Sequence, residues 1–186
     1  MNPAVTLSFL SLGKVQGWDA AFYILAQFAG GIAGVKIAEL IMGKSLRHAS
    51  VNYVATTPGP RGIATAFVAE LIISFVMMTV VLNVSNAKRW SRLTPFVAAT
   101  LVALYITFEA PLSGMSMNPA RTFGSALPAQ EWTAVWIYFT APLAGMLGAA
   151  QLFRARRGLH QVFCAKFHHH NSERCIFRCN YGELAT

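Results

Sequence analysis

The sequence predicts an all-α membrane protein whose helical bundle holds four full transmembrane helices and two shorter half-helices. Three observations support this prediction. First, 55% of the 186 residues are hydrophobic and only 12% are charged, whereas soluble domains carry about 25% charge. Second, four apolar stretches are long enough to cross a bilayer, which takes about 20 helical residues. Third, two shorter apolar stretches both begin with Asn-Pro-Ala.

The four long apolar stretches are separated by turn-rich or charged segments. Examples of such separators are TTPGPRG at 56–62 and SNAKRWSRL at 85–93. Since each long stretch has few charges and sufficient length, each is expected to form a membrane-spanning helix. The predicted spans are 20–42, 62–85, 95–112 and 133–153.

The two short apolar stretches, 3–12 and 119–128, are expected to be half-helices. Ten helical residues cover about 15 Å, which is half of the hydrocarbon core. Asn is a favoured helix N-cap and Pro is favoured at the first helical position. Each Asn-Pro-Ala is therefore predicted to start a helix inside the membrane. Two matched breaks at membrane depth indicate an inverted repeat with a site at the midplane.

The two motifs continue beyond the shared triplet, as MNPAVT at 1–6 and MNPARTFGSA at 117–126. This pair resembles the major intrinsic protein family, the aquaporins and aquaglyceroporins. The resemblance covers about 1–153 and includes the Arg after the second motif and the order of spans. It implies an aquaporin-like bundle, a homotetramer in a lipid bilayer, and a passive channel for water. The remaining 154–186 is interpreted as a basic cytoplasmic tail that contains Cys and His.

The paired motifs have a physical rationale as a pore centre. The N-terminus of a helix carries about half a positive charge. Two such ends that face each other form a barrier to cations and protons, while the Asn amides can donate hydrogen bonds to a passing oxygen. The resemblance implies this arrangement at Asn2, Pro3, Ala4, Asn118, Pro119 and Ala120.

The resemblance also implies a selectivity constriction. Arg121 matches the family's constriction Arg by position, and Met115 and Ile106 match two further positions. Water-selective members often have His where this chain has Ile106, so the apolar pair favours small neutral solutes such as glycerol. Glycerol channels tend to have an Asp and a basic residue at the positions of Thr122 and Ala126, whose identities favour water. The expected solute is water, with small neutral solutes as the alternative.

Several polar residues within the spans are interpreted as structural supports. By resemblance, Glu70 accepts hydrogen bonds from the backbone of the second re-entrant loop; the alternative role is a proton relay. Gln27 is expected to serve the first loop similarly. Lys36 and Glu39 are expected to pair on one helix face. Glu109 lies near the outer end of its span, where it is solvated, caps the chain or tunes the pore mouth.

Small residues recur at helical spacing in two spans. Gly30 and Gly34 form G-x-x-x-G, and Ala141, Gly145 and Ala149 form a second stripe. Such stripes let helices approach closely within a membrane. They are interpreted as packing features.

The tail carries the sequence CAKFHHHNSERCIFRC, which includes every cysteine of the chain. Thiolate and imidazole ligands together suit zinc, so Cys164, His168, Cys175 and Cys179 are candidate ligands. Their spacings differ from those of the common zinc modules. The favoured interpretation is a basic, partly disordered tail without a metal, and no cofactor is expected.

The formal net charge is +8. Such an excess of basic residues is typical either of a protein that binds nucleic acid or of membrane helices whose cytoplasmic ends are basic. The basic residues cluster between apolar runs and after the last one, which excludes nucleic acid. The same bias places the 86–94 loop and the tail in the cytoplasm, in a plasma (inner) membrane. The spans contain no nucleophile–base pair, phosphate-binding loop or coupled carboxylate pair, so the chain is not expected to be an enzyme.

The resemblance carries an expectation about chain length. The family has six full spans, whereas four are predicted here, and the first motif starts at the first residue. The chain is expected to lack the first two transmembrane helices, as a truncated or mis-started reading frame would. On that basis the chain as written is expected to conduct poorly. The rival hypotheses are a non-conducting membrane fragment and a metal-responsive membrane protein.

Overall fold

The computed structural model describes residues 2–87, 89–166 and 175–180, and all regular secondary structure in these residues is helical. Four segments in the described part of the chain are long and apolar enough to span a membrane, which confirms the predicted fold class. The third of them joins a 3₁₀ turn, η2, to α5. The elements are α2 (Gly17–Met42), α4 (Ile63–Ser85), η2 (Ser91–Leu93), α5 (Thr94–Phe108) and α8 (Trp136–Arg157).

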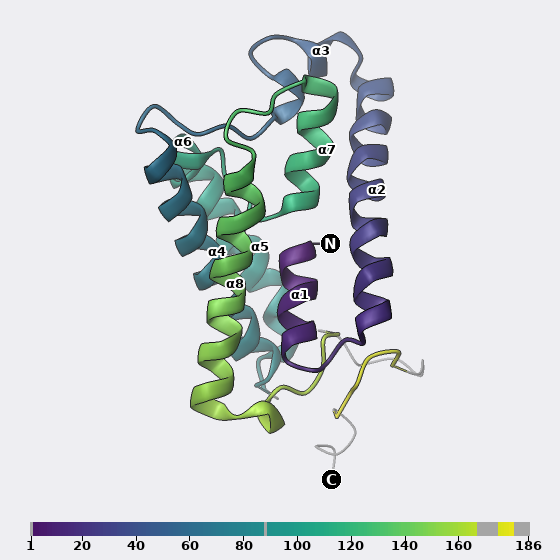
Figure 1. Cartoon of the computed structure of the whole chain (residues 1–186), viewed down its shortest axis with the longest axis vertical. Coiled ribbons are helices and arrows are strands. Elements are labelled where there is room, and N and C mark those ends of the chain that lie inside the picture. The colour runs from purple at the N-terminus through teal and green to yellow at the C-terminus, as the bar shows by residue number, and fades with distance from the viewer. Residues whose placement is uncertain (1, 88, 167–174, 181–186) are drawn as a thin grey trace.

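The two half-helices are α1 (Pro3–Ser11) and α7 (Pro119–Ala129). Figure 1 shows α7 above α1, with the start of each helix directed toward the other, between α2 on one side and α8 on the other. α1 packs mainly on α8, and α7 packs mainly on α2. The starts of both half-helices therefore lie within the bundle, away from its two ends.

The predicted span 95–112 is the one that the structure breaks. α5 ends at Phe108, and a separate short helix, α6 (Ala110–Ser113), follows. Pro111 explains the break, because proline has no N–H to donate and its ring clashes with the preceding turn of a continuous helix. The remaining short elements are α3 (Lys44–Arg47), η1 (Asn52–Val54) and η3 (Leu159–Gln161).

The tightest helix pair is α4 with α8. A Cβ added at Gly145 would lie 2.4 Å from the carbonyl oxygen of Leu71, so only glycine permits this crossing. Ala141 and Ala149 are buried on the same face of α8. The small-residue stripe predicted on this span is confirmed as a packing surface.

Gly30 and Gly34, predicted as a packing stripe on α2, make no close helix contact within the described part of the chain. A Cβ added at either residue would meet no atom within 4 Å. The close approach lies at Gly31, where a Cβ would be 2.6 Å from the carbonyl oxygen of Ala120, and at Gly124, where it would be 2.7 Å from the backbone of Gly31. The sequence has glycines at 30, 31 and 34, and only the packing of α7 selects the middle one.

α2 leaves most of its surface uncovered. Ala20 and Gln27 are its only buried residues, while large apolar side chains such as Phe22, Leu25 and Leu40 are 67–85% exposed. Exposed apolar surface of this extent is suited to lipid or to another membrane helix. At the α3 end of α2, Lys36 and Glu39 form an ion pair with a 2.9 Å N···O distance, which confirms the predicted pairing.

The contact between α2 and α7 predicts opposite effects for two glycine substitutions on α2. Gly31→Ala should lower the free energy of unfolding by about 1–3 kcal/mol, because the new methyl group would overlap backbone that cannot move freely. Gly34→Ala is the matched control and should be neutral or stabilising by up to about 1 kcal/mol, because Ala favours helix over Gly. Unfolding in detergent micelles, followed by tryptophan fluorescence, measures both. Equal stability of the two variants would contradict the assignment.

Candidate functional site

Both half-helices begin with the same cap. The Oδ1 atom of Asn2 accepts a hydrogen bond from the N–H of Ala4 at 2.9 Å. The Oδ1 atom of Asn118 accepts from the N–H of Ala120 at 3.1 Å and from that of Arg121 at 3.3 Å. In each case a proline follows the cap in the first helical turn. The Asn-Pro pairs thus fix where the two helices start.

A direct hydrogen bond joins the two half-helix starts. The Nδ2 atom of Asn2 donates to the carbonyl oxygen of Met117 at 2.6 Å, across 115 positions of sequence. An amide nitrogen carries two hydrogens, and this bond takes one of them. The bond therefore fixes the amide of Asn2 in position beside the start of α7.

The two Asn side chains line one cavity of about 640 Å³. Its wall is mainly apolar and comes from α1, η1, α4, α5, α6, the loop before α7, α7 itself and α8. Arg121 is the only charged residue among the described residues that line it. The polar lining residues are Asn2, Ser116, Asn118 and Arg121.

The structure brings the three predicted constriction residues to this same cavity. Arg121, Met115 and Ile106 all line it, although they come from α7, the loop before it and α5. Met115 is 7% exposed and Ile106 is 57% exposed. The cavity wall around Arg121 therefore includes two apolar side chains, as the sequence suggested for these positions.

Arg121 has a partner that sequence reasoning missed. Its Nη1 atom donates to the Oγ1 atom of Thr56 at 2.5 Å, and Thr56 in turn lies 3.2 Å from the Oγ1 atom of Thr122. Thr56 comes from the turn-rich loop between α3 and α4. No motif marks Thr56, so only the fold of that loop over α7 reveals the contact.

Glu70 lies in the middle of α4, fully buried. Its carboxylate accepts three hydrogen bonds from the segment before α7. The donors are the N–H of Ser116 at 2.6 Å, the N–H of Met117 at 2.8 Å and the hydroxyl of Ser113 at 2.9 Å. A buried backbone N–H without an acceptor costs about 1–3 kcal/mol. The N–H groups of Ser116 and Met117 lie between α6 and α7 and have no backbone acceptor in either helix, so the Glu70 carboxylate supplies it.

The loop that Glu70 supports has unusual backbone geometry. Gly114, Met115 and Met117 have φ values of 79°, 48° and 52°. Non-glycine residues rarely adopt positive φ, and each such residue costs about 1–3 kcal/mol. This backbone turns the chain from α6 into α7 within a few residues. The backbone N–H groups of Ser116 and Met117 in this turn have no backbone partner in a helix, so they need hydrogen-bond acceptors from elsewhere in the protein.

Two further supports of this loop were not predicted. The hydroxyl of Tyr138, which is fully buried on α8, donates to the carbonyl oxygen of Ser113 at 2.6 Å. The Oγ atom of Ser116 lies 2.5 Å from the Oγ1 atom of Thr122 and donates to the carbonyl oxygen of Asn118 at 3.0 Å. Ser and Tyr in an apolar span are the only sequence signal, and it is not specific.

The first half-helix has a smaller support. The Nε2 atom of Gln27 on α2 donates to the Oγ1 atom of Thr6 at 2.9 Å. Thr6 in turn donates to the carbonyl oxygen of Asn2 at 3.2 Å. Gln27 therefore connects α2 to the cap of α1 through one hydroxyl group.

Glu109 lies at the junction of α5 and α6 and is 7% exposed. Both of its carboxylate oxygens are buried without a hydrogen bond of normal geometry to any described residue. The hydroxyl of Tyr105, one turn earlier on α5, is in the same state. Neither residue is among those that line the large cavity.

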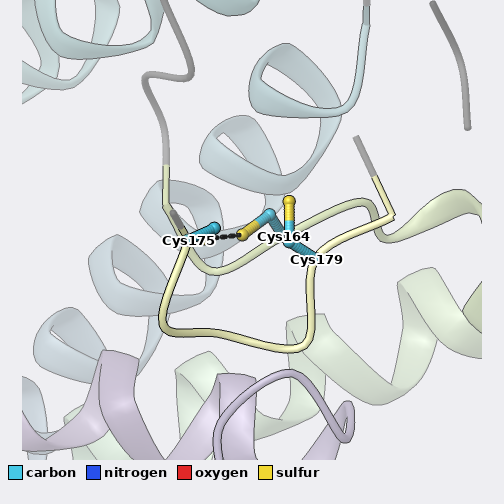
Figure 2. A group of neighbouring side chains, drawn as sticks. All are labelled: Cys164, Cys175 and Cys179. Atoms are coloured by element: carbon cyan, nitrogen blue, oxygen red, sulfur yellow. Dashed lines mark hydrogen bonds between the residues drawn. The ribbon is translucent and has the colours of Figure 1, made fainter. Parts of the chain in front are cut away.

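Three of the four candidate metal ligands gather in the tail. The Sγ atoms of Cys164, Cys175 and Cys179 all lie within 4.8 Å of one another, and Figure 2 shows their side chains grouped where two loop segments meet. The fourth candidate, His168, lies outside the described residues. The loop segments that carry this group lie at the end of the bundle where α1 ends (Figure 1), and none of the three cysteines lines the large cavity.

Comparisons with known proteins agree on one family. The family model for the major intrinsic protein matches residues 1–153. Aquaporin NIP1-4 of Oryza sativa subsp. japonica is 36% identical over 151 residues, which cover 81% of this chain and 54% of that relative. Aquaporin NIP2-1 of Zea mays is also 36% identical over 151 residues, covering 81% of this chain and 49% of the relative. The chain spans about half the length of the curated relatives it matches.

A solved structure has the same fold. The X-ray structure of the aquaglyceroporin from Plasmodium falciparum superimposes with a TM-score of 0.71 and covers 84% of this chain and 71% of its own. The sequence identity is 21%, so the likeness concerns the fold.

The Glu70 contacts predict a selective loss of stability on removal of one acceptor. In Glu70→Gln an amide NH₂ replaces one carboxylate oxygen, so at least one of the N–H donors of Ser116 and Met117 loses its acceptor. The free energy of unfolding in micelles should fall by about 1–3 kcal/mol.

The matched control is Glu131→Gln, the same substitution in the loop before α8, where Glu131 accepts one hydrogen bond from Thr133. This variant should stay within about 0.5 kcal/mol of the parent chain. Equal unfolding curves for the two variants would contradict the role given to Glu70.

Proposed function

Because this chain belongs to the major intrinsic protein family, we propose that it builds a passive pore for water through a membrane. One observation carries the proposal. The two half-helix starts, with Asn2 and Asn118, meet on a single largely apolar cavity that also holds Arg121. No covalent chemistry is required of these residues, so the proposed activity is transport and not catalysis.

The cavity wall suits water better than ions. An ion that enters loses its hydration shell, and a mainly apolar wall cannot replace it. A water molecule needs only a few hydrogen bonds, which the amides of Asn2 and Asn118 provide at the midpoint. Both half-helices direct their N-terminal ends here, where each carries about half a positive charge. Aquaporin-type channels are the standing example of such half-helix ends, together with an Arg, excluding protons and cations.

Arg121 supplies the second part of the proposed barrier. Its guanidinium group stays charged at all relevant pH values, and the hydrogen bond to Thr56 holds it at the cavity wall. A fixed positive charge on a mainly apolar cavity wall repels cations. It still offers hydrogen-bond donors to water. In this role Thr56 is a positioning residue that acts through Arg121.

A second candidate function is transport of small neutral solutes such as glycerol. The supporting observation is the apolar pair of Met115 and Ile106 on the same cavity as Arg121. Two apolar side chains on the same cavity as one cation would accommodate the carbon skeleton of a polyol while Arg121 binds its hydroxyl groups. Thr122 is buried and bonded to Thr56 and Ser116, which is compatible with water as the main solute.

The proposed setting is a plasma (inner) membrane, with the tail in the cytoplasm and the protein assembled as a homotetramer. The charges of the loops support the orientation, because basic residues dominate the 86–94 segment and the tail. The largely uncovered apolar surface of α2 supports contact with lipid or with another copy.

Osmotic flux into vesicles tests the proposal. Because the chain spans about half the length of its curated relatives, the assay uses a chimera in which the N-terminal spans of a family member precede residue 1. The chimera should raise water flux well above that of empty vesicles. A folded chimera without water or glycerol flux would overturn the channel proposal.

The charge of Arg121 predicts a change in selectivity. In the chimera, Arg121→Ala should keep or increase water flux and should introduce a measurable proton or cation leak, because the fixed positive charge is gone. Arg61→Ala, in the exposed loop before α4, removes the same charge away from the cavity and should change neither quantity. Stopped-flow light scattering measures water, and a pH-sensitive dye inside the vesicles measures protons. An unchanged proton leak in Arg121→Ala would contradict the role of this residue.

A further inference from the structure

The tail contains a group of three thiols that the proposed pore does not use. Cys164 lies in one loop segment, while Cys175 and Cys179 lie in another. The Sγ atoms of Cys164 and Cys175 are 3.5 Å apart, and all three Sγ atoms lie within 4.8 Å of one another.

The backbone on both sides of this group is held by hydrogen bonds. The N–H of Phe163 donates to the Oδ1 atom of Asn86, at the end of α4, at 2.7 Å. The N–H of Asn180 donates to the carbonyl oxygen of Phe163 at 2.9 Å, which ties the two loop segments together. The N–H of Arg178 donates to the carbonyl oxygen of Lys14 at 3.2 Å. The thiols are thus brought together by the fold itself.

We propose that Cys164, Cys175 and Cys179 form a binding site for one thiophilic d¹⁰ metal ion, Zn²⁺ or Cu⁺, at the end of the bundle where α1 ends. Thiolate ligands select these ions over hard cations. With metal–sulfur bonds of about 2.3 Å, three thiolates around one ion lie about 3.8–4.0 Å apart. The Cys164–Cys175 distance of 3.5 Å and the upper limit of 4.8 Å for the three pairs therefore differ from this geometry by no more than about 1 Å.

The surroundings of the group favour bound thiolates. The N–H of Lys166 donates to the Sγ atom of Cys164 at 3.3 Å, and such outer hydrogen bonds orient and stabilise metal ligands. The tail also has six basic residues against two acidic ones over 154–186, which offsets the negative charge of three thiolates around a mono- or divalent ion. Binding forms three metal–sulfur bonds, releases three thiol protons and changes no oxidation state.

Burial limits access to one of the three thiols. Cys164 is only 3% exposed, so a reagent in solution is expected to reach its Sγ atom slowly.

A disulfide accounts for the group less well. A disulfide needs a sulfur–sulfur distance of about 2.05 Å, and joining Cys164 to Cys175 would leave Cys179 without a role. A metal ion uses all three thiols. Disulfide formation is accordingly one of the results that would overturn the proposal.

The site would fix the tail against the bundle. Phe177 lies between two of the ligands in sequence, and its ring centroid is 6.0 Å from that of Tyr23 on α2. Phe177 and Ala165 line a cavity of about 190 Å³ together with residues of α1 and α2, Asn2 among them. A metal ion held by the cysteines would therefore hold the loop that closes one side of this cavity.

Metal stoichiometry on the full chain tests the proposal. The protein is purified in micelles with a non-thiol reductant and titrated separately with Zn²⁺ and, without oxygen, with Cu⁺, each against a competing chelator. One ion per chain should bind, and the two titrations identify which ion binds more tightly. Cys164→Ser, Cys175→Ser and Cys179→Ser should each reduce the metal affinity at least tenfold.

The histidine run of the tail needs its own control, because His168, His169 and His170 can bind metal without the cysteines. A variant with all three changed to Ala should still bind one ion. Loss of binding in this variant alone, or unchanged binding in the three Cys→Ser variants, would overturn the proposal.

Alkylation of the unmodified protein covers the case in which a serine variant fails to fold. Mass spectrometry after iodoacetamide treatment should show all three cysteines protected when the ion is bound, and Cys175 and Cys179, which are both partly exposed, modified when it is absent. Absence of protection, or recovery of a Cys164–Cys175 disulfide in reducing buffer, would contradict the metal site. The osmotic flux assay does not enter this test, so the site and the channel proposal can fail independently.

Discussion

The carboxylate of Glu70 is the interaction on which the central part of this protein depends. It reaches from the middle of α4 to accept three hydrogen bonds from the chain that leads into α7. In an apolar environment the backbone of a loop has no water to bind, so every N–H must find an acceptor inside the protein. A single buried acidic side chain meets that need, and the start of α7 lies where it does as a result.

The other contacts extend this support. Tyr138 holds the opposite side of the same loop through the carbonyl oxygen of Ser113. The hydrogen bond from Asn2 to the carbonyl oxygen of Met117 fixes the start of the first half-helix relative to this loop. The left-handed conformations of Met115 and Met117 persist because these contacts fix the chain on several sides. The cavity that both half-helices line is thus maintained by polar contacts within an otherwise apolar bundle.

Helix contacts set the outer frame. α4 and α8 approach at Gly145, and α2 and α7 approach at Gly31 and Gly124. In lipid, close backbone approach replaces the hydrophobic effect as the main source of helix association. The tail is attached to this frame at Asn86 and Lys14, which brings the cysteines together next to α1.

The sequence alone determined which segments are helices and where the half-helices begin. The length of an apolar run and an Asn-Pro cap depend only on neighbouring residues, so both can be recognised in a short stretch of sequence. The tertiary structure decided which residues meet. The choice of Gly31 over Gly30 or Gly34, the contact of Thr56 with Arg121 and the grouping of the three cysteines all depend on segments far apart in the chain. No local pattern encodes such contacts, because they depend on the relative positions of whole helices and loops.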